Sequence, residues 1–362
     1  MAQDPDPVTR AELDALVAAS ADGDELATAQ LRDRFGARLQ FGTAGLRGRL
    51  GAGPNRMNRV LVAQAAAGLA AYLREREPHP SVVIGYDGRH NSAVFARDSA
   101  ELLHGAGVSA TLLPRPLPTP VLAFAVRERN ASAGIMVTAS HNPASDNGYK
   151  VYLGGLDAGS QIVPPADADI AARIELIAAG SITGLPRDPR YTTADDTIVD
   201  EYVRRTAALV THRSTPAFVY TAMHGVGWQT ASAVFAAAGL PAPVSVAQQQ
   251  EPDPDFPTVA FPNPEEPGAL DLAFAAATES GAGLVIAHDP DADRLAVGIP
   301  AADGGWRRLS GNEVGWLLGW RVARAFEAGG PDGTLAASLV SSPALSVVAR
   351  AAHLDYVETL TG

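Results

Sequence analysis

The chain has 362 residues, a formal net charge of −12, 46% hydrophobic residues and no cysteine. The acidic balance and the lack of a basic run argue against nucleic acid and anionic membranes, whose binding needs clustered cations. The missing cysteine excludes disulfides and thiolate metal sites. Without a signal-like N-terminus or a run of ~20 apolar residues, the protein is expected in the cytoplasm. Its length predicts two or three domains of about 100–200 residues each.

Strand-like and helix-like segments alternate along most of the chain. This alternation predicts α/β layers with predominantly parallel sheets. A linker-like stretch rich in proline and aspartate places one domain boundary near residue 195, and polar turn residues place a second near 304. The predicted strands cover 81–86, 134–137, 217–220, 283–287, 334–340 and 354–358, and the predicted helices cover 93–104, 230–238, 270–278 and 343–352.

Glycines surround Arg47 in the segment 41–48. Glycine allows the backbone to approach an anion closely, and arginine supplies a bidentate fork of donors. The segment could therefore bind phosphate, although an ordinary glycine-rich turn explains it equally well. The turn 224–227 has the same two interpretations, with a structural turn favoured. Residues 310–313 have the pattern of a helix N-terminus capped by Ser310 or Asn312.

The most informative segment runs from 134 to 150. A strand-like apolar run ends in a small polar turn, where Ser140 stands beside His141. Ten residues after the serine comes Lys150, the only lysine in a chain with 27 arginines. A desolvated lysine can shift its pKa and exchange a proton, whereas arginine keeps its proton. A lysine retained by chance is the alternative, but its position favours an active site.

A Ser-His-Asp hydrolase is the competing chemistry for Ser140. The segment 138–142 lacks the Gly-x-Ser-x-Gly turn of that class. His141 is also adjacent in sequence, which is poor geometry for the base of its own neighbour. A serine that carries a phosphoryl group, close to a metal ion and Lys150, makes better use of these residues.

Three aspartates, Asp289, Asp291 and Asp293, alternate along a tight loop after the predicted strand 283–287. Carboxylates so spaced can converge on one hard cation such as Mg²⁺. An EF-hand is excluded, because position six would be an arginine and position twelve a proline. A solvated acidic turn is the remaining alternative. Arg294 could hold a phosphate shared with the metal, or form a local ion pair with the aspartates.

Taken together, the segments 138–143 and 289–294 resemble the motifs of the α-D-phosphohexomutase superfamily, the phosphoglucomutases and phosphomannomutases. Other segments are similar to the phosphopentomutase-like branch. The resemblance extends from about residue 35 to the end of the sequence. The additional matching segments are 41–48, 85–89, 146–150, 224–227, 256–259, 262–266 and 310–313.

The resemblance implies a role for each candidate residue. Ser140 would be the phosphoserine that donates and regains a phosphoryl group, and Lys150 would be the general acid/base. Mg²⁺ would be held by a phosphoserine oxygen and the three aspartates. Such a transfer needs positioning and charge neutralisation above all. The remaining assignments are His141 and Arg47 at the catalytic centre, and Thr43, Asn142, Arg294 and His224 in substrate or phosphate binding.

The resemblance also implies consecutive α/β/α layered domains with mostly parallel, mixed sheets. Residues 1–195 would form the phosphoserine-bearing catalytic domain, 196–304 the magnesium-binding domain and 305–362 part of a third, sugar-binding domain, with the fourth absent. The implied reaction moves a phosphoryl group between positions of a hexose or pentose monophosphate through a sugar bisphosphate. Glucose 1,6-bisphosphate would serve as activator. The alternative is a truncated, weakly active or non-catalytic fragment that binds phosphosugar and Mg²⁺.

Overall fold

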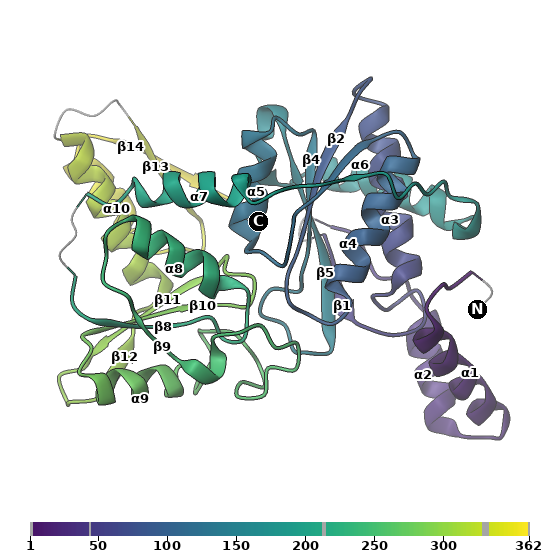
Figure 1. Ribbon diagram of the computed structural model, residues 1–362, viewed down its shortest axis with the longest axis horizontal. Coiled ribbons are helices and arrows are strands. Elements are labelled where there is room, and N and C mark those ends of the chain that lie inside the picture. The colour runs from purple at the N-terminus through teal and green to yellow at the C-terminus, as the bar shows by residue number, and fades with distance from the viewer. Residues whose placement is uncertain (1–2, 43–44, 212–214, 328–332, 361–362) are drawn as a thin grey trace.

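The computed structural model describes residues 3–42, 45–211, 215–327 and 333–360, and the structural statements below refer to these residues. They form three sheets that follow one another along the chain, with helices packed against them (Figure 1). The predicted α/β class is confirmed. In each of the two larger sheets, the pairs toward one edge are antiparallel, and the remaining pairs, out to the opposite edge, are parallel.

The first sheet has seven strands, which are β1 (Leu46–Arg49), β2 (Ser81–Tyr86), β3 (Ser109–Leu112), β4 (Ala133–Val137), β5 (Asp146–Leu153), β6 (Ser160–Gln161) and β7 (Thr192–Thr193). Their order is β1-β5-β4-β2-β3-β7, with β6 beside β5. All five residues of β4 are buried, as in a strand covered by helices on both faces. The stretch predicted as a linker contains β7, which extends this sheet.

Four helices accompany the first sheet, namely α3 (Arg59–Arg74), α4 (Ser92–Gly105), α5 (Thr119–Glu128) and α6 (Ala166–Ala178). The α3 helix begins after Asn58, whose side chain accepts a hydrogen bond from the N–H of Leu61 at 2.9 Å. It packs against α4 and α6. Gly68 allows α6 to approach closely, because a Cβ there would lie 2.5 Å from Cγ1 of Ile174.

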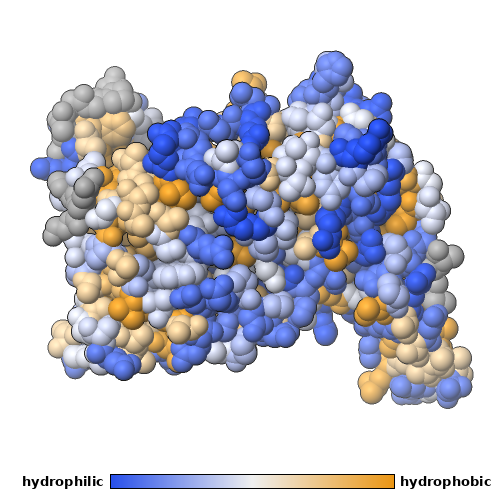
Figure 2. Space-filling view, viewed as in Figure 1, coloured by the Kyte–Doolittle hydropathy of each residue, from blue (hydrophilic) through white to orange (hydrophobic). Residues whose placement is uncertain are grey.

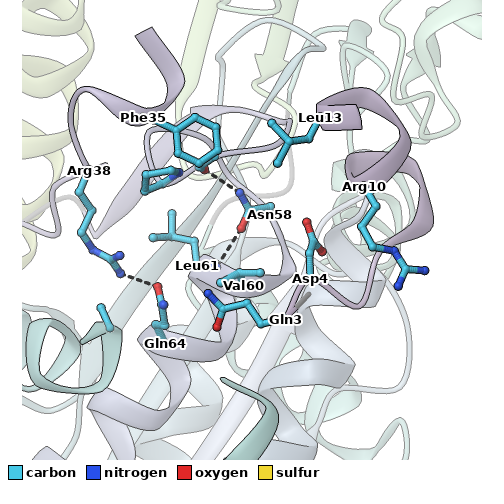
Figure 3. A pocket seen from close by; sticks show the side chains of 13 residues that line it. Gln3, Asp4, Arg10, Leu13, Phe35, Arg38, Asn58, Val60, Leu61 and Gln64 are labelled. Atoms are coloured by element: carbon cyan, nitrogen blue, oxygen red, sulfur yellow. Dashed lines mark hydrogen bonds between the residues drawn. The ribbon is translucent and has the colours of Figure 1, made fainter. Parts of the chain in front are cut away.

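The N-terminal helices α1 (Pro7–Ala21) and α2 (Glu25–Phe35) form a hairpin that projects from one end of the molecule (Figure 1). Where the hairpin meets α3, a pocket of about 280 Å³ remains (Figure 3). Leu13 and Phe35 face Leu61 across it, and Arg38 donates a hydrogen bond to Gln64 at its edge. Its lining includes no residue assigned to the chemistry, so this pocket is separate from the candidate site.

The second sheet has five strands, which are β8 (Phe218–Thr221), β9 (Val244–Ser245), β10 (Leu284–His288), β11 (Leu295–Pro300) and β12 (Trp306–Arg308). Their order is β12-β11-β10-β8-β9. The accompanying helices are α7 (Thr197–Ala207), α8 (Gly227–Ala237) and α9 (Asp271–Ser280). Short 3-10 turns lie at Gly155–Asp157, Ile182–Gly184 and Ala247–Gln249. The domain boundaries near 195 and 304 stay a prediction; β12, beyond residue 304, pairs within this sheet.

The C-terminal elements are α10 (Gly311–Glu327), β13 (Thr334–Ser338), α11 (Ala344–Ala351) and β14 (Asp355–Thr359), with β13 and β14 paired in parallel. Ser310 caps α10 as predicted, since its Oγ accepts the N–H of Glu313 and the Glu313 carboxylate accepts the N–H of Ser310. Leu317, Leu318 and Trp320 are more than half exposed, and Figure 2 shows apolar side chains on this end of the molecule. Among the described helices, none has the length and hydropathy of a membrane span.

Candidate active site

The candidate site begins in the loop between β4 and β5. Ser140 lies there in a left-handed conformation, with φ at 52°, and its N–H donates to Oγ1 of Thr138 at 2.8 Å. The antiparallel pairing of β4 with β5 places Lys150 opposite Met136, one strand away from the loop. Ser140 and Lys150 are both at least 95% buried. The strand pairing therefore brings the serine and the lysine to the same end of the sheet.

The aspartate loop follows β10 in the second sheet. Oδ1 of Asp289 accepts the N–H of Arg294 at 2.9 Å, which closes the loop. The turn that contains His224 supports it from behind: Val226 donates its N–H to the carbonyl of Pro290 at 2.8 Å. Gly225 permits this contact, because a Cβ there would lie 2.3 Å from Cα of Pro290. The glycine-rich turn thus has a supporting role in the structure.

The two loops meet although about 150 residues separate them. Oγ of Ser140 donates to Oδ2 of Asp289 at 2.7 Å. Nζ of Lys150 lies 2.7 Å from Oδ2 of Asp291 and 2.6 Å from Oδ2 of Asp293. Serine, lysine and the three carboxylates therefore form a single cluster between the first and second sheets.

The donor set of this cluster suits a hard divalent cation. One ligand oxygen from each of Asp289, Asp291 and Asp293 lies within 4.8 Å of the others, and the first two residues are fully buried. Oδ1 of Asp291 is buried and has no hydrogen-bond donor among the described residues when the carboxylates are ionised. A buried anionic oxygen without a partner is costly, and a cation would satisfy it. The predicted convergence of the three aspartates is confirmed, and they could hold a metal ion.

The charges of the cluster influence one another strongly. Burial, followed by the negative charges of Asp291 and Asp293, raises the pKa of Asp289 well above its usual value. Burial alone would lower the pKa of Lys150, but the attraction of Asp291 and Asp293 outweighs it and raises that pKa. Lys150 therefore stands as an ammonium ion between two carboxylates, and it offsets part of their repulsion.

Other predicted residues line the edge of the cluster. Nδ1 of His141 lies 3.2 Å from Oγ of Ser140, and Nη1 of Arg47 donates to Oδ1 of Asn142 at 3.3 Å. Burial, then the charges of Arg294 and Arg47, lower the pKa of His141 to about 4, so the ring is neutral at pH 7. Arg294 and Arg47 therefore lie close enough to His141 for their charges to act on it. Cations gathered beside Ser140 suit a phosphorylated ligand.

Two predicted residues are not among those that the structure brings together here. Thr43 lies outside the described residues. His224 is buried, and its Nε2 is 2.8 Å from Oγ1 of Thr258 within the second part of the chain. The assignment of His224 to phosphate binding stays a prediction.

Sequence reasoning missed Thr119 and Arg89. Oγ1 of Thr119, at the start of α5, donates to Oδ2 of Asp291 at 2.6 Å, across 172 positions. Its sequence context, a threonine between two prolines, gives no sign of this contact. Arg89 lies in the segment 85–89, which the resemblance included without giving the residue a role.

Comparison with known proteins places the chain in a family. Residues 38–180 match the model for domain I, an alpha/beta/alpha domain, of phosphoglucomutase/phosphomannomutase, and residues 200–302 match the model for domain II. The chain belongs to the phosphoglucomutase/phosphomannomutase family. The family resemblance inferred from the sequence is therefore confirmed.

Individual relatives agree with this membership. The chain is 58% identical to a probable phosphomannomutase of Haemophilus influenzae, over 84% of this chain and 63% of that protein. It is 38% identical to a human phosphopentomutase, over 92% of this chain and 58% of that protein. A crystal structure of a putative phosphomannomutase from Thermus thermophilus has a TM-score of 0.72 and 26% identity, over 90% of this chain and 70% of that one. The chain spans about three fifths of the length of these curated relatives.

Proposed function

We propose that the chain takes part in phosphosugar mutase chemistry, with Ser140 as the residue that carries the phosphoryl group. The observation that carries the proposal is the contact of Ser140 Oγ with Asp289, 2.7 Å, inside a cluster that also holds Lys150. One hydrogen-bond partner would satisfy a buried serine hydroxyl, so a purely structural serine does not explain three carboxylates and an ammonium group around it. The names of the relatives, phosphomannomutase and phosphopentomutase, support the same class of reaction.

In the proposed cycle, phospho-Ser140 gives its phosphoryl group to a hydroxyl of a hexose or pentose monophosphate, which forms a sugar bisphosphate. The bisphosphate then reverses its orientation in the site, and Ser140 regains a phosphoryl group from the other position of the sugar. Asp289 orients the Ser140 hydroxyl through their hydrogen bond, and Lys150 exchanges the proton of the reacting oxygen. The number of phosphoryl groups is conserved, and glucose 1,6-bisphosphate is the proposed activator.

The chain's own residues fit the proposed magnesium ion. Asp289, Asp291, Asp293 and an oxygen of phosphorylated Ser140 would hold it, and it would neutralise charge on the transferring group. Arg47 and His141 are the further catalytic residues of the proposal, and Asn142 and Arg294 are its substrate- or phosphate-binding residues near Ser140. Thr43 and His224 keep their sequence-based assignment to substrate or phosphate binding.

The direct test is to locate the phosphate. After incubation with glucose 1,6-bisphosphate and Mg²⁺, intact-mass measurement and peptide mapping should find one phosphate on the Ser140 peptide. The phosphate should be lost in Ser140→Ala. The matched control is Ser145→Ala, because Ser145 lies in the same loop but its Oγ donates only to Asp146. Phosphate on another residue, with Ser140 unmodified, would refute the assignment.

A second measurement distinguishes the proposed mutase from the alternative, a protein that binds phosphosugar and Mg²⁺ without turnover. A coupled mutase assay primed with glucose 1,6-bisphosphate reports complete cycles, whereas phosphate on Ser140 reports only one half-reaction. A phosphorylated Ser140 without mutase turnover would favour the alternative.

A further inference from the structure

The segment 85–89 has no part in the chemistry proposed above, yet it lies at the base of the Ser140 loop. It runs out of β2, which pairs in parallel with β4, so that Tyr86 stands opposite Val137. The N–H of Asp87 donates to the carbonyl of Val137 at 3.1 Å. The chain that leaves β2 therefore enters the space directly beneath the loop that starts after β4.

The guanidinium group of Arg89 fills the centre of that loop. Its Nη2 donates to the carbonyl oxygens of Ser140, at 2.6 Å, and Asn142, at 2.5 Å. Its Nη1 donates to the carbonyl oxygens of Pro143, at 2.9 Å, and Asp146, at 3.2 Å. One side chain thus binds four carbonyls of the loop. The loop turns its carbonyls inward to Arg89, and the Ser140 hydroxyl points to Asp289.

Arg89 is 5% exposed, and Asp87 supplies its counter-charge in the interior. Oδ2 of Asp87 lies 3.4 Å from Nε of Arg89. Oδ1 of Asp87 accepts the N–H of Arg89, at 3.0 Å, and the hydroxyl of Ser92, at 2.6 Å. A buried cation needs such compensation. Lysine could not replace Arg89, since a single ammonium nitrogen cannot reach the four carbonyl oxygens that the planar guanidinium group spans.

The other face of Arg89 is covered by the part of the chain that carries the aspartates. The ring of Phe256 lies 4.8 Å from Cζ of Arg89, in cation–π contact. Gly88 permits this approach, because a Cβ there would lie 2.8 Å from Cβ of Pro252. Nε2 of His90 lies 2.8 Å from the Asp255 carboxylate beside it. The loop at 252–256 is therefore docked on the base of the Ser140 loop.

We infer that Arg89 is a positioning residue for phosphoryl transfer. It holds the Ser140 loop in the one conformation that keeps Ser140 left-handed and its hydroxyl directed at Asp289, and Phe256 ties this conformation to the second sheet. The inference rests on the proposed function of Ser140. It does not make Arg89 a catalytic residue, because its contacts are to backbone carbonyls and not to the reacting oxygen.

The test compares Arg89→Lys with Arg59→Lys. Arg59 is a matched control, because it makes a two-bond ion pair with the buried Asp98, at 2.6 and 2.8 Å, at the start of α3 and outside the Ser140 loop. Two quantities are measured at a temperature where all variants are folded. The first is amide hydrogen exchange of peptides covering 138–147. The second is the single-turnover rate of Ser140 phosphorylation as a function of glucose 1,6-bisphosphate concentration, with Mg²⁺ present.

In Arg89→Lys, exchange over 138–147 should be about tenfold faster, because the loop opens locally at a lower free energy. The maximal rate should fall about 100-fold, since a misplacement of the reacting group of ~1 Å has that effect. The half-saturating bisphosphate concentration should stay within about threefold, because the phosphate-binding side chains remain. Arg59→Lys should lose thermal stability and keep wild-type exchange in the loop and a wild-type rate.

Wild-type loop exchange and maximal rate in Arg89→Lys would overturn the inference, as would equal losses in Arg59→Lys. If Arg89→Lys does not fold, Phe256→Leu carries the same test, because it removes only the ring over Arg89; about a threefold to tenfold loss of maximal rate is then expected. A wild-type chain that never phosphorylates Ser140, with a loop still loosened by Arg89→Lys, would refute the proposed function and leave the positioning role intact.

Discussion

Lys150 is the residue on which the proposed chemistry can be tested most sharply. Its ammonium group lies between Asp291 and Asp293, so its charge and its proposed proton exchange have to be tested separately. Lys150→Arg keeps the charge and removes proton exchange at working pH. If Lys150 is the acid/base, Lys150→Arg should slow transfer from phospho-Ser140 to a sugar phosphate nearly as much as Lys150→Ala, by about 10²-fold or more. Single-turnover kinetics measure this rate. Near wild-type transfer in Lys150→Arg would make the lysine a charge anchor.

Asp291 tests the metal site. Both of its oxygens are buried, and Oδ1 has no donor among the described residues in the ionised cluster. Asp291→Asn removes one anionic ligand from a hard cation and should weaken Mg²⁺ binding at least about tenfold. Calorimetric titration measures the affinity. Asp271→Asn is the control, since Asp271 is exposed at the start of α9. Equal affinity in wild type and Asp291→Asn would exclude the site.

At the scale of secondary-structure elements, replacing two helical glycines by alanine should have opposite effects on the stability of the fold. Gly68 in α3 contacts α6, where an added Cβ would overlap Ile174, whereas Gly315 in α10 has open space around its Cβ position. Gly68→Ala should destabilise the fold by about 1–3 kcal/mol through overpacking. Gly315→Ala should stabilise α10 by about 0.5–1 kcal/mol, because alanine loses less backbone entropy in a helix. Denaturant unfolding of both variants measures the difference, and a stabilising Gly68→Ala would mean that α6 moves away freely.

Across the whole molecule, the three sheets differ in how well they are buried. Every residue of β4 is buried, and so are seven of the eight residues of β5, whereas β13 and β14 contain no buried residue. Local opening requires less free energy where little apolar surface is covered. Hydrogen exchange should therefore be much faster for peptides of 334–359 than for peptides of 133–153. Equal protection in the two regions would show that the C-terminal strands are stabilised by contacts other than burial.

The sequence alone determined the local features and the family. The apolar runs predicted β2, β4 and β10 close to their observed positions, because buried strands need continuous apolar residues. Ser310 was among the two expected caps because its side chain bonds to its own helix. The motifs around Ser140 and Asp289 indicated the class of chemistry, because each is a short, contiguous set of residues. Such features depend on neighbours in the chain, which a sequence displays directly.

Only the tertiary structure decided which of these motifs meet. Lys150 contacts Asp291 over 141 positions, and Thr119 contacts the same carboxylate over 172. Arg89 binds four backbone carbonyl oxygens. Every residue has such a carbonyl, so residue types do not indicate which of them Arg89 will bind. These contacts arise from the parallel pairing of β2 with β4 and from the docking of the second sheet on the first. They depend on how the packed layers bring loops together that are far apart in the sequence. The spacing of residues along the chain does not give the distance between such loops in space.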